Sequence, residues 1–118
     1  MLEKLKENSI LYDFYGALLP QKQREIFSLY YEDNYSLAEI AQHYGITRQG
    51  VHEAVKRSEK KLQSYEDKLG LKDKFKKTEH VLTHLSKEID KLILKFDQNE
   101  ELITQLHMMK DEIKKLNQ

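Results

Sequence analysis

The sequence predicts an all-α fold, in which a helical head containing a helix-turn-helix is followed by long amphipathic C-terminal helices. Three observations predict this class. Glycine and proline are scarce, with four glycines and one proline in 118 residues. Apolar residues recur at three- and four-residue spacing through much of the chain, and no alternating run is long enough for a sheet. With 39% hydrophobic and 34% charged residues, the chain can form a modest core surrounded by solvated helices.

Two helices are predicted before residue 35. Apolar residues at helical spacing from Leu2 to Tyr15 predict an amphipathic first helix. Pro20 stands where the first turn of a second helix tolerates proline. The apolar stripe of this second helix would consist of Ile26, Phe27, Tyr30 and Tyr31. The polar run at positions 32–34 is predicted to end it.

The next two helices are predicted from their capping residues. Ser36 and Glu39 fit a capping box, in which a serine oxygen and a glutamate side chain satisfy free amides at a helix start, so a third helix should begin at Leu37. Thr47 could cap a fourth helix, which should run to Gly70.

Residues Leu37–Lys56 together show the pattern of a helix-turn-helix. Ala41 would let the second helix of the unit cross closely over the first, and Gly45 would supply the positive φ of the turn. The apolar underside of the second helix would be formed by Ile46, Val51 and Ala54. The alternative is an ordinary helical hairpin.

Beyond Gly70 the apolar residues follow a heptad seam, which is typical of helices that pack against other helices. The seam consists of Leu71, Phe75, Thr78, Leu82, Leu85, Ile89, Leu92 and Phe96. The polar run Asp97–Glu100 is either a polar layer inside one long helix or a reversal between two helices. We therefore expect residues 1–70 to form the head and residues 71–118 to form an extension that dimerises or packs internally. A homodimer is the favoured interpretation.

The net charge of zero conceals a segregation along the chain. Residues 1–45 carry a net charge of −3, residues 46–77 carry +5, and residues 78–118 carry −2. A local positive segment can attract phosphate if the fold gathers it on one face. A solvated helix face that carries lysines would have the same composition.

Several other classes of protein and of site are disfavoured. The chain has no cysteine, so neither a disulfide framework nor a thiolate metal site is available. The charged N-terminus does not look like a signal peptide, and no stretch approaches 18 apolar residues, so we expect a cytoplasmic protein with no membrane partner. His80 and His84 have a spacing that can hold a metal but lack further ligands, and we interpret them as surface residues. No catalytic motif is present, so we expect neither an enzyme nor a cofactor.

A resemblance supports the helix-turn-helix interpretation. Residues Leu18–Leu62 resemble region four of bacterial sigma factors, and the first two thirds of the chain, including Tyr12–Gly16, resemble the YlxM family of small bacterial proteins. The resemblance implies a DNA-binding regulator that takes part in the signal recognition particle pathway, since members of that family are encoded beside components of the particle. The chain is too short for a complete sigma factor.

Carrying the sigma pattern over residue by residue gives a mixed match. Arg48 occupies the position of a base-reading arginine, whereas Gln49 and Glu53 depart from the sigma residues. The expected base contacts are Thr47, Arg48, Gln49, His52 and Glu53. The expected phosphate contacts are Ser36, Lys56, Arg57, Lys60 and Lys61. Promoter specificity is therefore not carried over.

Two functions remain open. The leading one is a DNA-binding regulator that uses the helix-turn-helix in the major groove. The rival is a protein or RNA interaction module that binds the signal recognition particle or RNA polymerase without reading a DNA sequence. Neutral net charge, Glu53 and a group of tyrosines support the rival. These tyrosines are Tyr30, Tyr31, Tyr35 and Tyr44.

Overall fold

A computed structural model describes residues 2–116, which form α-helices, one 3-10 helix and no strand. The predicted all-α class is confirmed. The elements in chain order are α1 (Leu2–Tyr15), η1 (Gly16–Leu18), α2 (Gln21–Tyr31), α3 (Leu37–Tyr44), α4 (Arg48–Leu69), α5 (Leu71–Lys95) and α6 (Glu100–Leu116). The chain divides into two compact units, Met1–Lys72 and Asp73–Gln118, which we call the head and the hairpin.

The helix boundaries in the head follow local signals in the sequence. Ser36 Oγ accepts the amide of Glu39 at 3.1 Å, and Glu39 Oε1 accepts the amide of Ser36 at 3.1 Å, so the capping box is present. Thr47 Oγ1 accepts the amide of Gly50 at 2.9 Å and caps α4. Gly45 ends α3 with a φ of 65°. Pro20 lies one residue earlier than predicted, as the residue that precedes α2 rather than within its first turn.

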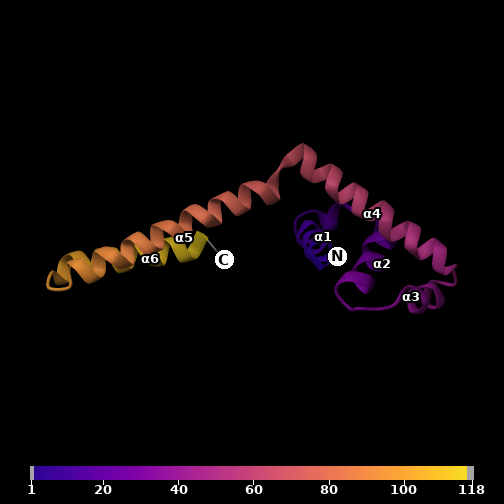
Figure 1. The fold of residues 1–118 in the computed structure, drawn as a ribbon, viewed down its shortest axis with the longest axis horizontal. Helices are drawn as coiled ribbons and strands as arrows, with labels where there is room; N and C mark the ends of the chain where they lie inside the picture. The colour runs from indigo at the N-terminus through magenta and orange to yellow at the C-terminus, as the bar shows by residue number, and fades with distance from the viewer. Residues whose placement is uncertain (1, 117–118) are drawn as a thin grey trace. The chain divides into compact units, whose positions relative to one another are not determined.

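The core of the head consists of two apolar clusters that share α4. Within the head, α1, α2 and α3 gather along one side of this helix (Figure 1). The first cluster joins α1, α2 and α4 through Leu11, Tyr15, Leu19, Phe27 and Leu62. The second joins α2, α3 and α4 through Ile26, Ile40, Ala41, Val51 and Val55. Both clusters contact the same side of α4, the first through Leu62 and the second through Val51 and Val55, so the opposite side of the helix faces solvent.

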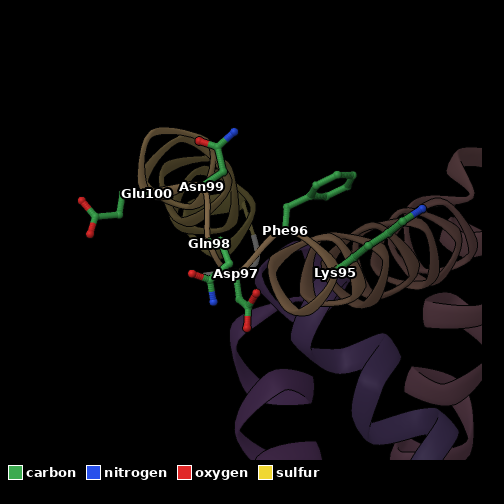
Figure 2. Close-up of a pocket in the computed structure, with 6 residues that line it drawn as sticks. All are labelled: Lys95, Phe96, Asp97, Gln98, Asn99 and Glu100. Carbon is green, nitrogen blue, oxygen red and sulfur yellow. The ribbon is translucent and has the colours of Figure 1, made fainter.

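The second unit is an antiparallel pair of helices, in which α6 runs back along α5 (Figure 1). The polar run after Lys95 therefore reverses the chain and does not continue one long helix. At the turn, Asn99 Oδ1 accepts the amide of Leu102 at 3.1 Å and caps the start of α6 (Figure 2).

Only part of the heptad seam is covered in the hairpin. Leu82, Ile89 and Leu106 are buried between the helices. By contrast, the seam residues Leu85 and Leu92 stay 44% and 42% exposed. The seam residues of α5 do lie along one side of a helix, but α6 covers only Leu82 and Ile89 and leaves Leu85 and Leu92 exposed. None of the helices within residues 2–116 combines the length and the apolar character needed to span a bilayer.

Candidate nucleic-acid interface

The candidate recognition helix is α4, and its orientation is set by one buried stripe. Val51, Val55, Ser58 and Leu62 are buried at spacings of four, three and four residues, which places them on one line of the helix. At 100° per residue, the line opposite this stripe passes through residues 49, 53, 56 and 60. The core of the head thus fixes which side chains of α4 face solvent.

The five predicted base-contact residues are all exposed at the start of this helix. They are Thr47, Arg48, Gln49, His52 and Glu53. Thr47 also caps α4, so its oxygen is occupied by the amide of Gly50, although its hydroxyl can still donate. The structure therefore brings all five into the first two turns, where a recognition helix contacts base edges.

Two of these residues interact with each other. Gln49 Nε2 lies 3.5 Å from Glu53 Oε1, one helical turn further on, which is the outer limit of a hydrogen bond. The carboxylate of Glu53 stands near the middle of the exposed line. A carboxylate can accept a hydrogen bond from the amino group of cytosine, and it repels phosphates.

The predicted phosphate-contact residues differ in exposure. Arg57 and Lys60 are exposed, Lys61 is half-buried, and Ser36 is exposed with its hydroxyl oxygen occupied by the cap of α3. Lys60 lies about 18 Å along the helix axis from Arg48, at 1.5 Å per residue. Because the major groove is about 12 Å wide, Lys60 can reach the flanking backbone when Arg48 reaches a base.

Lys56 is held by a contact that sequence reasoning missed. Its Nζ lies 3.4 Å from Glu59 Oε1, and the side chain of Glu59 is only 12% exposed. Glu59 also accepts the hydroxyl of Tyr31, which in turn accepts Asn8 Nδ2 at 3.1 Å. Burial first, and then the hydrogen bond to Glu59, raise the pKa of Tyr31. The charge of Lys56 is therefore partly balanced before any ligand binds.

The positive segment of the sequence is divided between the two units. Residues 46–72 of the head contain seven basic and four acidic side chains, whereas Lys74, Lys76 and Lys77 belong to the hairpin. Among the described residues, no ion pair joins Arg48, Arg57 or Lys60 to a carboxylate within 4.0 Å. The head therefore holds fewer cations than the positive segment of the sequence, but the charges of Arg48, Arg57 and Lys60 are not neutralised by an ion pair within residues 2–116.

The histidines do not assemble a metal site in the part of the chain that the structure describes. No group of three or more His, Asp or Glu side chains within residues 2–116 could hold a metal ion. His80 and His84 are exposed on α5.

Comparison with known proteins agrees with the helix-turn-helix geometry. The family UPF0122, described as "Putative helix-turn-helix protein, YlxM / p13 like", matches residues 2–106. The UPF0122 protein of Geobacillus sp. strain WCH70 is 42% identical over 111 residues, which cover 94% of this chain and 98% of the relative. The UPF0122 protein of Listeria monocytogenes is 38% identical over 106 residues, covering 90% and 96%. That of Halalkalibacterium halodurans is 45% identical over 91 residues, covering 77% and 84%. With these matches and the helix-turn-helix of α3 and α4, the chain belongs to the UPF0122 family.

Proposed function

We propose that this protein binds double-stranded DNA by placing the first two turns of α4 in the major groove, and that it acts by binding rather than by catalysis. The observation that carries this proposal is the exposure of five polar side chains at the start of a helix whose other face is fixed by the core. The fold is the one in which a recognition helix is positioned for base contact.

The roles of the side chains follow from their chemistry. Arg48 is exposed in the first turn, where its planar guanidinium can make a bidentate contact with guanine. Arg57 and Lys60 supply phosphate contacts, which fix position and give affinity without reading sequence. Glu53 opposes unspecific contact. Specificity would therefore come from Arg48, Gln49 and Glu53 together.

Selection of fragments from bacterial genomic DNA tests the proposal. Purified full-length protein is mixed with fragments at about 50 mM salt, with total RNA as competitor, and the bound DNA is sequenced. We expect a shared sequence among the retained fragments and affinity that falls steeply with salt. If the unmodified protein retains no DNA under these conditions, the proposal is wrong.

A matched variant separates reading of bases from general attraction. Arg48→Ala should lose the enrichment of the shared sequence. Lys68→Ala removes an exposed cation from the same helix about 30 Å further along its axis, and should retain the enrichment. If both variants behave like the unmodified protein, Arg48 does not read the bases.

One observation favours a second candidate function. The head as a whole holds eleven basic and eleven acidic residues, and Glu53 stands within its candidate interface. Such a balanced surface suits a module that binds a protein, such as a protein of the signal recognition particle or RNA polymerase. Retention of purified signal recognition particle protein or RNA polymerase by a chain that retains no DNA would favour this alternative.

A dimer would determine the kind of DNA site that the protein binds. A homodimer would place two recognition helices in one particle, and such particles bind paired half-sites about 34 Å apart. We therefore expect the selected fragments to contain an inverted repeat. A single unpaired sequence would indicate that each head binds independently.

A further inference from the structure

The two sides of the hairpin differ in chemistry. Between the helices lie Leu82, Ile89 and Leu106. On one side of this buried line, Asp90 of α5 and Lys110 of α6 form an ion pair of 2.6 Å. This pair identifies the side of the hairpin that is polar and closed.

The opposite side is apolar and open. At 100° per residue, the flank of α5 that faces away from Asp90 carries Val81, Leu85 and Leu92, and the flank of α6 that faces away from Lys110 carries Leu102, Met109 and Leu116. We call these six apolar residues the open face; the exposed polar residues Glu88 and Gln105 lie on the same flanks. Five of the six stay between 42% and 71% exposed, and Leu102 is half-buried.

The open face extends along the hairpin, with Gln105 between Leu102 and Met109 on α6. The turn is centred between Asp97 and Gln98, so residues equally far from it on α5 and α6 lie at about the same level. Leu92 is therefore within about one residue of the level of Leu102, and Leu85 within about one residue of the level of Met109. At the turn, Phe96 is 41% exposed and points away from the polar side chains that follow it (Figure 2).

We infer that the open face pairs with the open face of a second copy of this chain, forming an antiparallel four-helix bundle in which α5 packs against α6 of the other copy. An exposed apolar face of this kind marks an interaction surface. The described hairpin buries only three side chains, and so small a core normally needs oligomerisation for stability. The inference does not depend on DNA binding.

The charges at the edge of the open face favour a second copy in this arrangement. With a two-fold axis parallel to the helices, Lys95 at the edge of α5 lies level with Glu101 at the edge of α6 in the other copy. Pairing α5 with α5 about the middle of the helix would instead place Lys95 level with position 71 of the other copy, with Lys74 of that copy one turn away. Opposite charges lie level in the first arrangement, and like charges lie within one turn of each other in the second.

Two adjacent methionines provide a matched test. Met109 belongs to the open face and is 53% exposed, whereas Met108 points elsewhere on α6 and is 63% exposed. Sedimentation equilibrium of the full chain should give about twice 14.1 kDa at micromolar concentration. Met109→Glu should weaken the association at least about tenfold, and Met108→Glu should leave it unchanged. Far-UV circular dichroism shows whether each variant keeps its helices.

The charge pairing is tested by a reversal. Glu101→Lys should weaken the dimer, and adding Lys95→Glu to the same chain should restore it. Because the double variant keeps the lysine at position 101, recovery cannot come from a change within α6.

The outcomes separate the second copy from other ways of covering the face. A 14.1 kDa monomer at high micromolar concentration overturns the inference and indicates that the face is covered within one chain or by another protein. Equal effects of the two methionine variants also overturn it. If adding Lys95→Glu fails to restore a dimer that Glu101→Lys has weakened, the pairing of α5 with α6 is wrong.

Discussion

The hydroxyl of Tyr15 donates a hydrogen bond of 2.6 Å to Glu66 Oε1, and both side chains are buried in the head. The same two groups satisfy the first amides of α5. Tyr15 Oη accepts the amide of Leu71 at 3.0 Å, and Glu66 Oε1 accepts that of Lys72 at 2.9 Å. A side chain from α1 and another from α4 therefore cap the helix that follows Gly70.

Removal of the Tyr15 hydroxyl should destabilise the head. Tyr15→Phe leaves the buried carboxylate of Glu66 without its donor and the amide of Leu71 without its acceptor, and such unsatisfied groups are costly. We expect the melting temperature to fall by roughly 4–8 °C. An unchanged melting temperature in thermal unfolding would contradict this role. Tyr65→Phe removes an exposed hydroxyl with a 3.5 Å contact and is the control.

The same tyrosine predicts a dependence on alkaline pH. Burial first, and then the hydrogen bond and negative charge of Glu66, raise the pKa of Tyr15, although the amide of Leu71 opposes this. Unfolded tyrosine has a pKa of about 10, so the stabilisation is complete below pH 10 and is lost as pH rises through the folded pKa. Urea unfolding from pH 8 to 11 should show stability falling above about pH 10, less steeply in Tyr15→Phe. Equal slopes in both proteins would exclude Tyr15 as a cause.

Ser36 can be tested separately as a cap and as a phosphate contact. Ser36→Ala should lower stability by about 1 kcal/mol, because it removes the cap of α3. Ser36→Asp keeps an acceptor at this position and should retain the stability. If Ser36 also contacts phosphate, the aspartate variant should bind DNA more weakly in filter binding even though it is folded normally. Equal DNA affinity would show that Ser36 serves only the helix.

The sequence predicted the parts of the fold that depend on local chemistry. Ser36, Gly45 and Thr47 act within three or four residues of themselves, so the boundaries they set could be read directly. Pro20 was placed one residue off, because proline is compatible both with the position before a helix and with its first turn. The division of the heptad seam could not be predicted, since either flank of an apolar stripe can face the partner helix when the partner is unknown.

The site was predictable to the same extent. Exposure of Arg48, Gln49 and Glu53 follows from the periodicity of the buried stripe, which the sequence contains. The pairing of Lys56 with Glu59 has the spacing of an ordinary helical pair, but its burial depends on Tyr31, 28 residues earlier than Glu59. Contacts at that separation are made by the tertiary fold, and periodicity carries no information about them.

Arg48 should affect specificity without affecting stability, because it is exposed. Arg48→Ala is expected to weaken binding to the selected sequence by about 1–3 kcal/mol, the value of a bidentate base contact. Arg48→Lys keeps the charge but loses the planar fork, so it should retain binding to unrelated DNA and lose most of the preference. Titration of labelled duplexes with and without the selected sequence measures both. If lysine restores the full preference, the contact is not bidentate.

Lys60 and Lys56 should differ despite their neighbouring places on the exposed line. Lys60→Ala should weaken binding to all sequences alike and reduce the slope of affinity against salt by about one. Lys56→Ala should have a smaller effect, because Glu59 already balances this charge. Salt titrations of both variants measure the slopes. A larger effect at Lys56 would mean that the ion pair opens when DNA binds.

The hairpin and the head can be followed by different signals, because all seven tyrosines lie between residues 12 and 65. Tyrosine fluorescence therefore reports the head, whereas far-UV circular dichroism reports the helices of both units. Ile89 is 6% exposed between α5 and α6, and Leu94 on the same helix is 79% exposed. Ile89→Ala should destabilise the hairpin by roughly 2–5 kcal/mol, as buried aliphatic truncations do, and Leu94→Ala should change little.

In Ile89→Ala, the circular dichroism transition should move to lower urea concentration while the fluorescence transition stays in place. That separation is expected if each unit has its own core, because Ile89 contributes to neither apolar cluster of the head. A common shift of both signals would instead mean that the two units unfold as one. The substitution would also weaken association indirectly, because a hairpin that is partly unfolded presents no intact open face. Met109 is an exposed residue of that face, so Met109→Glu should dissociate the chains without shifting either unfolding transition.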